Sequence, residues 1–300
     1  MSQKWQSATK THIPVMPKEV LSHLNIQKDG VYVDGTIGLG GHSQLILSQL
    51  SAKGRLVGVD RDAEALEICK KRLSPYSSSL SLYNKSYDKI NSILDGLEIQ
   101  KVNGIFLDLG LSSFQLDSKD RGFSYKTNCE LDMRFDRSQK KSAFNIVNNT
   151  PEKVLADLIY FNSEERRSRA IARKIVSMRP INKVFGLVEA IKKSTPPFKR
   201  DKTISRVFQA IRISVNNELE KLDQFLSTFY PRLLNGGRIV IISFHSLEDR
   251  KVKHAFKLLK NKGKVQILTK KPLIPTEIEK IENSRSKSAK LRAAERKDDA

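Results

Sequence analysis

Three aspartates stand out in this sequence because each directly follows a short apolar run of β-forming residues. They are Asp34, Asp60 and Asp108. Where such runs form neighbouring parallel strands, their carboxyl ends meet along one edge of the sheet, and ligands bind at that edge. We therefore expect the three carboxylates to line one crevice, where they can accept hydrogen bonds from hydroxyl or amine groups of a ligand.

A glycine-rich stretch follows Asp34, with four glycines between positions 35 and 41, and the run 43–47 after it is compatible with a helix. A strand that ends in a glycine turn and continues as a helix directs backbone N–H groups into a crevice. The missing Cβ atoms let a ligand approach the backbone closely. The pattern predicts a loop that cradles a cofactor. A tight strand-to-helix turn without a ligand is the alternative.

Asp60 lies about twenty residues beyond this loop, the position from which an acid accepts hydrogen bonds from ribose hydroxyls. Sheets that bind NAD and sheets that bind S-adenosylmethionine share this feature. The loop favours the second ligand, because Ser43 stands where the dinucleotide pattern G-x-G-x-x-G requires its last glycine. S-adenosylmethionine has no pyrophosphate and does not need that geometry. For Asp60, a solvated strand-end carboxylate is the alternative.

The segment from Asp108 to Gln115 follows the last of the three apolar runs. Aspartate and glutamine side chains there can hydrogen-bond a cofactor or the edge of a nucleobase. Group transfer to an exocyclic amine depends on in-line placement and on acceptors for the N–H hydrogens more than on a strong base. For Ser112 and Ser113, which lie between them, simple turn chemistry is the alternative.

Two histidines lie close to these segments. His42 follows the glycine loop, and we expect it to contact the cofactor through its backbone, with no need for a catalytic imidazole. His245 and Ser246 form a pair, but the chain has no G-x-S-x-G elbow, which disfavours a serine hydrolase. We expect Ser246 to cap a helix, and His245 either to face the substrate or to be hydrogen-bonded at the domain edge.

The positive charge is concentrated in two segments. The chain has a net charge of +21. Residues 166–206 contain thirteen Lys and Arg against two acids, and residues 250–271 contain nine and no acid. A local excess of this size indicates a polyanionic partner, most simply RNA or DNA. The alternative is a basic face that is only solvated. Two dense basic runs make this alternative less favourable than a single run would.

Cysteine content and hydropathy exclude several classes. The chain has two cysteines, Cys69 and Cys129, without the spacing of a metal site, so we expect neither a disulfide nor a bound metal. The first residues contain no apolar segment of a leader peptide, and no run approaches the ~18 apolar residues of a membrane span. We expect a cytoplasmic protein that does not enter a membrane.

The alternation of apolar runs with helical patterns predicts an α/β fold, a doubly wound (Rossmann-like) parallel sheet with an all-helical insert. We expect the sheet domain at 1–118 and 207–300 and the insert at 119–206. Strands are predicted at 31–34, 55–60, 80–83, 104–108, 238–244, 264–269 and 288–294. Helices are predicted at 17–24, 63–73, 142–147, 151–160, 164–178, 184–193 and 207–234, and residues 283–290 are expected to be exposed. Asp62, Thr150 and Ser246 are the expected N-caps.

Seven motifs of the chain resemble those of a known family, the bacterial small-subunit ribosomal RNA cytosine-N4 methyltransferases (MraW/RsmH family). The likeness runs from position 12 to the end of the chain and is highly specific as a set. The motifs are Asp34-Gly35-Thr36-x-Gly38-x-Gly40-Gly41-His42-Ser43, Asp108-Leu109-Gly110-Leu111-Ser112-Ser113-x-Gln115-Leu116-Asp117, Arg121-Gly122-Phe123-Ser124, Leu131-Asp132-Met133-Arg134-Phe135-Asp136, Phe208-Gln209-Ala210-Ile211-Arg212-Ile213, Ser243-Phe244-His245-Ser246-Leu247-Glu248-Asp249-Arg250 and Ser288-Ala289-Lys290-Leu291-Arg292.

The resemblance implies a class I methyltransferase sheet, S-adenosyl-L-methionine as the methyl donor, and a cytosine of the decoding region as the acceptor. It implies small-subunit ribosomal RNA or the small ribosomal subunit as partner, the insert as the RNA-recognition domain, and a monomer or homodimer. Asp108 would also position the substrate amine. The cofactor contacts that it implies are Gly40, Gly41, His42, Asp60, Tyr87, Asp108 and Gln115.

Two departures from the family pattern occur. Phe114 stands where proline is usual, and Lys202-Thr203-Ile204-Ser205 replaces a usual His-Pro-Ala-Thr. The alternative to a methyltransferase is an RNA-binding ribosome-assembly factor with an idle catalytic site. The intact glycine loop and Asp60 favour the enzyme. An NAD-dependent oxidoreductase is a third possibility, which the loop disfavours and which leaves the charge unexplained.

Overall fold

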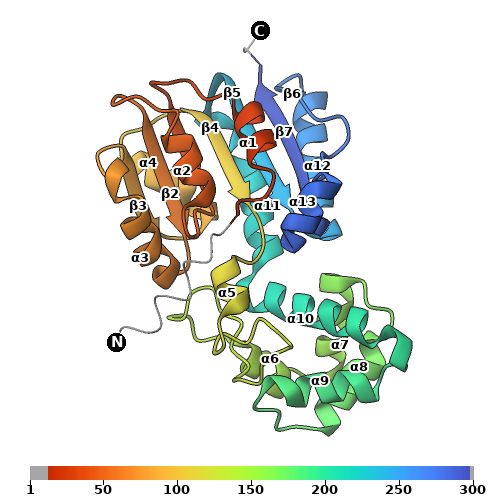
Figure 1. Ribbon diagram of the computed structural model, residues 1–300. Helices are drawn as coiled ribbons and strands as arrows, with labels where there is room; N and C mark the ends of the chain where they lie inside the picture. Colours follow the sequence, from red (N-terminus) through yellow and green to blue (C-terminus); the bar gives the residue numbers. More distant parts are fainter. Residues whose placement is uncertain (1–12, 298–300) are drawn as a thin grey trace. The chain divides into compact units, whose positions relative to one another are not determined.

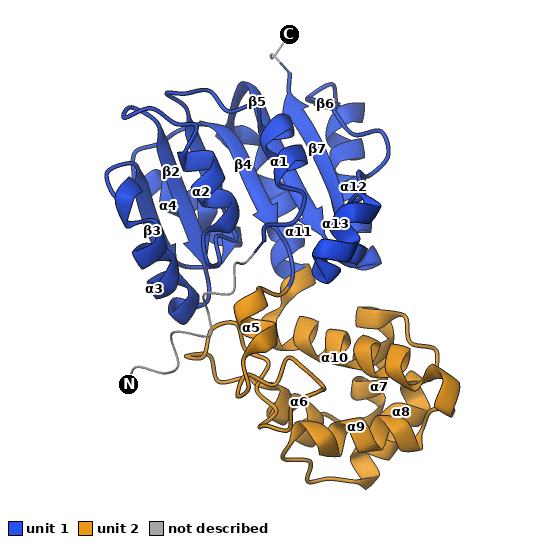
Figure 2. Ribbon diagram, in the orientation of Figure 1, with its two compact units in different colours: residues 1–110, 220–300 blue, residues 111–219 orange. Residues whose placement is uncertain are grey.

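The computed structural model describes residues 13–297 (Figure 1). The chain forms two compact units, unit 1 with residues 1–110 and 220–300 and unit 2 with residues 111–219 (Figure 2). The first dozen residues, part of the basis for the expected absence of a leader peptide, lie outside the described range. Each unit is described in turn.

Unit 1 contains a seven-stranded sheet with the order β3-β2-β1-β4-β5-β7-β6. The strand order reverses between β1 and β4, as in a doubly wound sheet. All strands run parallel except β7, which pairs antiparallel with both β5 and β6, so the sheet is mixed and not purely parallel. The strands are β1 Val31–Asp34, β2 Arg55–Asp60, β3 Leu80–Asn84, β4 Val102–Asp108, β5 Leu233–Ser243, β6 Val265–Ile267 and β7 Lys290–Arg296.

Helices cover both faces of this sheet (Figure 1). Side chains alternate along a strand, and in β4 Phe106 packs into one apolar core while its neighbours Ile105 and Leu107 pack into the other. One core includes side chains of α1, α2 and α3, and the other includes side chains of α4, α11 and α12. The helices are α1 Pro17–Leu24, α2 Gly41–Leu47, α3 Ala63–Arg72, α4 Ile90–Gly96, α11 Glu218–Thr228, α12 Ser246–Asn261 and α13 Glu277–Glu282.

Unit 2 is helical and has an apolar core of its own, formed by residues such as Leu155, Ile171 and Ile191. Its one extended pairing is an isolated bridge between Glu130 and Lys183. The helices are α5 Ser113–Asp117, α6 Ala143–Asn149, α7 Glu152–Ser163, α8 Ser168–Ser177, α9 Val184–Lys193 and α10 Arg200–Asn216. Short 3₁₀ turns complete the two units: η2 Ser74–Tyr76, η3 Tyr87–Lys89, η4 Pro197–Lys199, η5 Tyr230–Arg232 and η6 Ser284–Ser288.

The single long helix expected at 207–234 is wrong. Asn217 has a left-handed backbone, with φ of 51°, and it separates α10 from α11. The compact units accordingly meet at 110/111 and 219/220, whereas the sequence suggested 118/119 and 206/207. A boundary at 206 would cut α10, which is continuous and packs against α7.

The strand expected at 238–244 begins earlier: β5 starts at Leu233, so Asn235, Gly236 and Gly237 lie inside it. Gly236 has φ of 71°, and the register of β5 against β4 shifts here, as it does at a β-bulge. Thr150 ends α6, and Pro151 takes the N-cap of α7 in its place. α13 was not predicted, and Ser286 in the segment expected to be exposed is fully buried.

Candidate functional site

Asp34, Asp60 and Asp108 are the last residues of β1, β2 and β4, three neighbouring strands in the order β2-β1-β4. The structure therefore places all three at one edge of the sheet, as expected. This edge includes the point between β1 and β4 where the strand order reverses. Ligands of doubly wound sheets bind at such a point.

Asp34 is buried, and protein groups contact both of its carboxyl oxygens. Oδ1 accepts a hydrogen bond from the Thr36 N–H at 3.1 Å, and Oδ2 accepts one from the Ser43 hydroxyl at 2.7 Å. Burial raises the pKa of Asp34 to about 7, against which these two hydrogen bonds act. Asp34 thus ties the beginning of the glycine loop to α2.

Two of the loop glycines are required by packing within the protein. A Cβ on Gly35 would overlap Leu107 Cδ2. A Cβ on Gly40 would lie 2.9 Å from both Cys69 Sγ and Leu73 Cδ1, and Gly40 also has φ of 79°. Packing against α3 and β4 therefore also requires these two glycines, and the close approach of a ligand to the loop backbone stays a prediction.

Asp60 fixes the other end of the loop. Its Oδ2 accepts a hydrogen bond from the Gly38 N–H at 2.8 Å, and its Oδ1 accepts one from the Asp62 N–H at 2.9 Å. Burial raises the pKa of Asp60 to about 6. The side chain is partly exposed, and a carboxylate oxygen accepts more than one hydrogen bond, so a ligand hydroxyl can still be bound. Asp62 caps α3 through Glu64 N–H and Ala65 N–H, as predicted.

His42 is buried on α2, and its imidazole connects two segments. Nε2 lies 2.8 Å from the Val15 carbonyl oxygen, and since a carbonyl only accepts, this nitrogen carries the hydrogen. Nδ1 lies 3.6 Å from Asp108 Oδ2, and the ring centroid lies 4.7 Å from that of Phe106. The expected backbone contact with a cofactor is untested, and the structure adds a role for the side chain.

Asp108 differs from the other two aspartates. Its N–H donates to Thr36 Oγ1 at 2.6 Å, and its Oδ1 is buried with no hydrogen-bond partner among residues 13–297. Burial raises the pKa of Asp108 well above the ordinary value, and the negative charges of Asp34 and Glu248 add to this. A carboxyl group with a raised pKa and an unsatisfied oxygen at the ligand edge is suited to binding or accepting a proton.

Tyr87 begins η3, and its Cβ lies beside the loop, 3.1 Å from where a Cβ on Gly35 would be. Its ring makes an edge-to-face contact with Phe225, with centroids 5.9 Å apart. The ring is partly buried, which leaves part of it accessible. This position is compatible with the predicted cofactor contact.

Gln115 lies in unit 2 and forms a capping box with Ser112 at the start of α5. The Ser112 N–H donates to Gln115 Oε1 at 3.1 Å, and the Gln115 N–H donates to Ser112 Oγ at 3.2 Å. The serine chemistry is therefore helix capping and not a simple turn. The structure gives Gln115 a role in the fold, and its contact with a cofactor stays a prediction.

His245, and not Ser246, is the N-cap of α12, so that expectation is wrong. The His245 Nδ1 accepts a hydrogen bond from the Glu248 N–H at 3.4 Å, in the place a serine oxygen would take. Its Nε2 lies 3.1 Å from Glu248 Oε1. The structure shows this hydrogen bond of His245, and the other alternative, that His245 faces the substrate, is untested. Asp249 holds Arg292 through bonds of 2.6 and 3.2 Å and so joins α12 to β7.

Sequence reasoning missed three contributors to this site: the Thr36 hydroxyl, the Ser43 hydroxyl and the Val15 carbonyl. The first two lie within the glycine-rich motif, where Ser43 was considered only because it stands in place of a glycine. Short hydroxyl side chains close to Asp34 in the sequence could have indicated these two hydrogen bonds. The Val15 carbonyl has no sequence signature.

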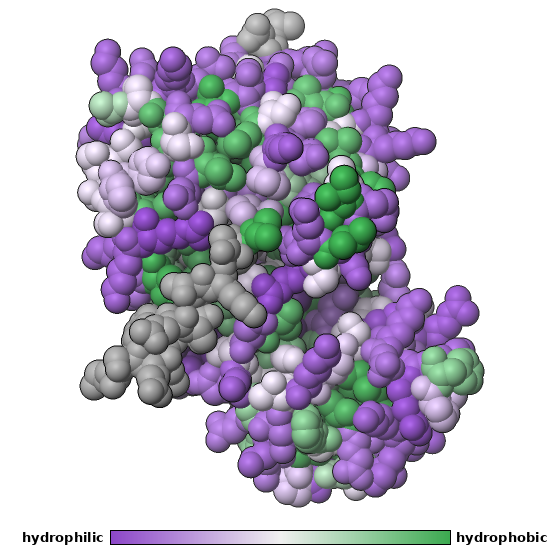
Figure 3. Space-filling model, in the orientation of Figure 1, coloured by the Kyte–Doolittle hydropathy of each residue, from purple (hydrophilic) through white to green (hydrophobic). Residues whose placement is uncertain are grey.

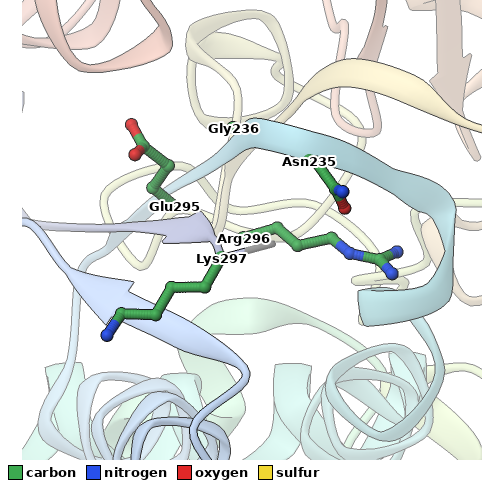
Figure 4. A pocket seen from close by; sticks show the side chains of 5 residues that line it. All are labelled: Asn235, Gly236, Glu295, Arg296 and Lys297. Carbon is green, nitrogen blue, oxygen red and sulfur yellow. The ribbon is translucent and has the colours of Figure 1, made fainter. Parts of the chain in front are cut away.

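A separate hollow in unit 1 is lined by Asn235, Gly236 and residues 295–297, which Figure 4 shows at close range. These residues lie toward the beginning of β5 and at the end of the antiparallel β7. The hollow is thus at the opposite edge of the sheet from the three aspartates. Arg296 donates to the Leu233 carbonyl at 2.8 Å and lies over the Tyr230 ring, which is a packing role.

The basic runs lie in both units. Residues 166–206 belong to unit 2 and residues 250–271 to unit 1. On α12 the lysines Lys253, Lys257 and Lys260 are exposed at positions i, i+4 and i+7, so they share one side of the helix. In the part of the chain that the structure covers, no helix is both long enough and apolar enough to span a membrane.

The doubly wound sheet and its row of strand-end carboxylates define a Rossmann-like protein, with the switch point as its candidate ligand site. Comparison with known proteins makes this more specific. The model of the MraW methylase family matches residues 9–297, and the chain belongs to this family.

Proteins called ribosomal RNA small subunit methyltransferase H are similar over nearly their whole length. That of Thermosipho africanus is 48% identical over 95% of this chain and 97% of its own. That of Kosmotoga olearia is 47% identical, with 96% and 98% covered. Among solved structures, an S-adenosylmethionine-dependent O-methyltransferase from Thermotoga maritima is a remote neighbour, 7% identical with a TM-score of 0.45 over 98% of this chain and 71% of that one.

Proposed function

We propose that this protein transfers a methyl group from S-adenosylmethionine to the exocyclic N4 of a cytidine in the decoding region of small-subunit ribosomal RNA. Asp108 carries the proposal. Its buried Oδ1 has no hydrogen-bond partner among the described residues, and leaving such an atom unsatisfied costs about 1–3 kcal/mol. A substrate amine that donates to this oxygen would remove that cost.

The residues at the sheet edge fit S-adenosylmethionine. Asp60 would accept hydrogen bonds from the ribose hydroxyls, and Tyr87 would flank the bound cofactor beside the loop. The backbone of Gly40, Gly41 and His42, where α2 begins, would hold its amino-acid end. When bound, S-adenosylmethionine supplies an electrophilic methyl group. Family membership and the names of the relatives support this donor.

The chain's own groups would then position the acceptor. Asp108 in its ionised form would accept a hydrogen bond from the cytosine amine and hold the nitrogen lone pair toward the donor. The methyl group would pass from the sulfonium sulfur of the donor, which would keep the electron pair of the broken S–C bond, to this nitrogen. The methylated nitrogen would then be more acidic, and the raised pKa of Asp108 suits it to accept the released proton. Thr36 and His42 would hold this carboxyl group in place, through the Asp108 N–H and through Oδ2.

The basic segments support RNA as the substrate, because they would bind its phosphates. The cytosine would have to be unpaired or turned out of a helix before it could reach Asp108. We propose small-subunit ribosomal RNA, free or in the subunit, as the partner in the cytoplasm. The names of the relatives support this acceptor.

Nucleoside analysis of small-subunit RNA tests the reaction. RNA from cells that lack the protein should have lost N4-methylation of one cytidine in the decoding region, and the intact gene should restore it. An unchanged modification in the deletion strain would exclude this substrate.

The idle assembly factor gains some support from the loop, because the glycines and Asp60 have reasons within the fold that do not involve a ligand. Calorimetric titration separates the two functions. The enzyme binds S-adenosylmethionine, and Asp60→Ala should weaken that binding. The assembly factor binds none.

A further inference from the structure

Two aromatic side chains of unit 2 are unusually exposed. Phe198 is 82% exposed and Phe161 is 68% exposed, although each could bury a large apolar area. Unit 2 has a complete apolar core without them. In Figure 3 the visible surface of this unit is mostly hydrophilic, with hydrophobic residues set among hydrophilic ones. Because the apolar core of unit 2 does not include these two rings, their exposure indicates a role in binding.

The backbone presents Phe198 rigidly. It lies in η4, Pro197–Lys199, directly after Pro196 and Pro197, and each proline fixes its own φ angle. The Lys199 Nζ lies over the Phe198 ring, 5.3 Å from the centroid. The Arg200 guanidinium donates to the Thr195 carbonyl at 3.3 Å and closes the turn. An aromatic ring beside a cation is thus held outward on a short, stiff segment.

Phe161 lies on a neighbouring segment of the same unit. Near the end of α7, its ring meets that of Tyr160 edge to face, with centroids 5.4 Å apart. Asn162 donates to the Ala210 carbonyl at 3.2 Å, which ties this end of α7 to α10, the helix that η4 precedes.

Two further contacts join the segments that carry Phe161 and Phe198. The Arg167 Nε donates to the Ser194 carbonyl at 3.0 Å, and the Arg206 Nη1 lies 3.4 Å from Glu165 Oε2. The loop after α7 and the loop before α10 therefore form one region. We call it the aromatic–basic surface, with Phe161, Arg167, Phe198, Lys199, Lys202 and Arg206.

Single-stranded RNA matches this surface better than other partners. Unpaired bases present flat faces that stack on aromatic rings, while lysine and arginine bind the phosphates. A duplex hides its base faces inside the stack. A protein partner would favour a continuous apolar patch, but here the segments that carry the two rings also carry exposed cationic residues.

We propose that the aromatic–basic surface binds unpaired nucleotides of the substrate RNA by stacking bases on Phe198 and Phe161. The inference rests on the proposed RNA substrate. It adds a recognition site on unit 2 that selects single-stranded RNA. The departure from the family pattern at 202–205 falls within the same segment of the chain.

Fluorescence anisotropy of the full-length protein tests this with a short labelled RNA, used single-stranded and annealed to its complement. Phe198→Ala should weaken binding of the single strand roughly 5- to 100-fold, the effect of losing one stacked base, and change duplex binding less than about twofold. Phe198→Trp should retain binding, because a larger ring still stacks. Phe161→Ala should act in the same direction.

Ile281→Ala in α13 is the matched control, since Ile281 is 83% exposed but lies in unit 1 beside Glu282. It should leave both affinities unchanged. The inference is overturned if Phe198→Ala binds the single strand like the wild type, or weakens both probes equally. It is also overturned if Phe198→Ala keeps its affinity for RNA but no longer binds vesicles of phosphatidylglycerol, because the surface would then bind an anionic membrane and not RNA. If the wild-type protein transfers no methyl group, this would instead refute the proposed function.

Discussion

At the scale of single residues, the three strand-end aspartates have the same position in their strands but different surroundings. Asp34 accepts hydrogen bonds from Thr36 and Ser43, at the two ends of the loop between β1 and α2. Asp60 binds the loop at the Gly38 N–H with one carboxyl oxygen and the Asp62 N–H, at the start of α3, with the other. Asp108 has one oxygen near His42 and a buried one without a partner among residues 13–297. We therefore propose the proton chemistry for Asp108, a structural role for Asp34, and for Asp60 both a structural role and the proposed contact with the ribose.

Asp108→Asn should lower kcat/KM for methyl transfer by about 10²- to 10⁴-fold, because an amide cannot take up a proton from the amine. Affinity for S-adenosylmethionine should fall much less, and the fold should be kept, since asparagine has nearly the same shape. Methyl-transfer kinetics and calorimetry measure the two effects. A variant with near wild-type kcat would remove Asp108 from the mechanism.

The pH dependence follows from the raised pKa of Asp108. Only the ionised carboxylate can accept the amine hydrogen, so kcat should rise with pH as this group ionises, above the range of an ordinary carboxyl group. In Asp108→Asn this rise should be absent. A pH profile of single-turnover rates would show it, and a rate that is flat with pH in the wild type would contradict the assignment.

At the scale of elements, the loop between β1 and α2 owes its conformation to packing against α3 and β4. Gly40→Ala should destabilise the protein by about 1–3 kcal/mol, because the new Cβ meets Cys69 and Leu73 at a backbone angle that alanine rarely adopts. Chemical denaturation measures this. Gly96→Ala is the matched control: among residues 13–297, no side chain or distant backbone atom lies within 4 Å of a Cβ added there, and no loss is expected. Equal stabilities of the two variants would refute the packing role.

Sequence predicted the strand ends of this site well and the helices less well. A short apolar run that stops at a carboxylate marks β1, β2 and β4 without ambiguity. The left-handed Asn217 that divides α10 from α11 does not interrupt the helical spacing of the apolar residues. The helices α5 and α13 are too short to show such a spacing. Contacts between distant segments, such as Thr36 with Asp108, are set by tertiary packing alone.

At the scale of the whole molecule, positive charge in both units is the main feature beyond the sheet. Family membership, predicted from the motifs, is confirmed over nearly the whole chain. What the motifs could not predict was how many of their residues serve the fold: Arg121 is fully buried and donates to the Arg134 and Phe135 carbonyls. A motif identifies the family, and the structure assigns its residues to fold or to chemistry.

The charge predicts a steep dependence of RNA affinity on salt. Replacing Lys253, Lys257 and Lys260 by Gln should reduce the slope of log Kd against log salt by about 2–3, roughly 0.7–0.9 for each lost phosphate contact. Affinity for S-adenosylmethionine should not change. Filter binding at several salt concentrations gives the slope, and an unchanged slope would place the RNA away from α12.

Methyl transfer by the purified protein to small subunits from cells that lack it tests the central claim most directly. With S-adenosylmethionine labelled in its methyl group, mass spectrometry of the digested RNA identifies the modified atom. We expect label on N4 of one cytidine in the decoding region, and none with Asp108→Asn. Label on another atom or another base, or no label with the wild-type protein, would contradict the proposed function.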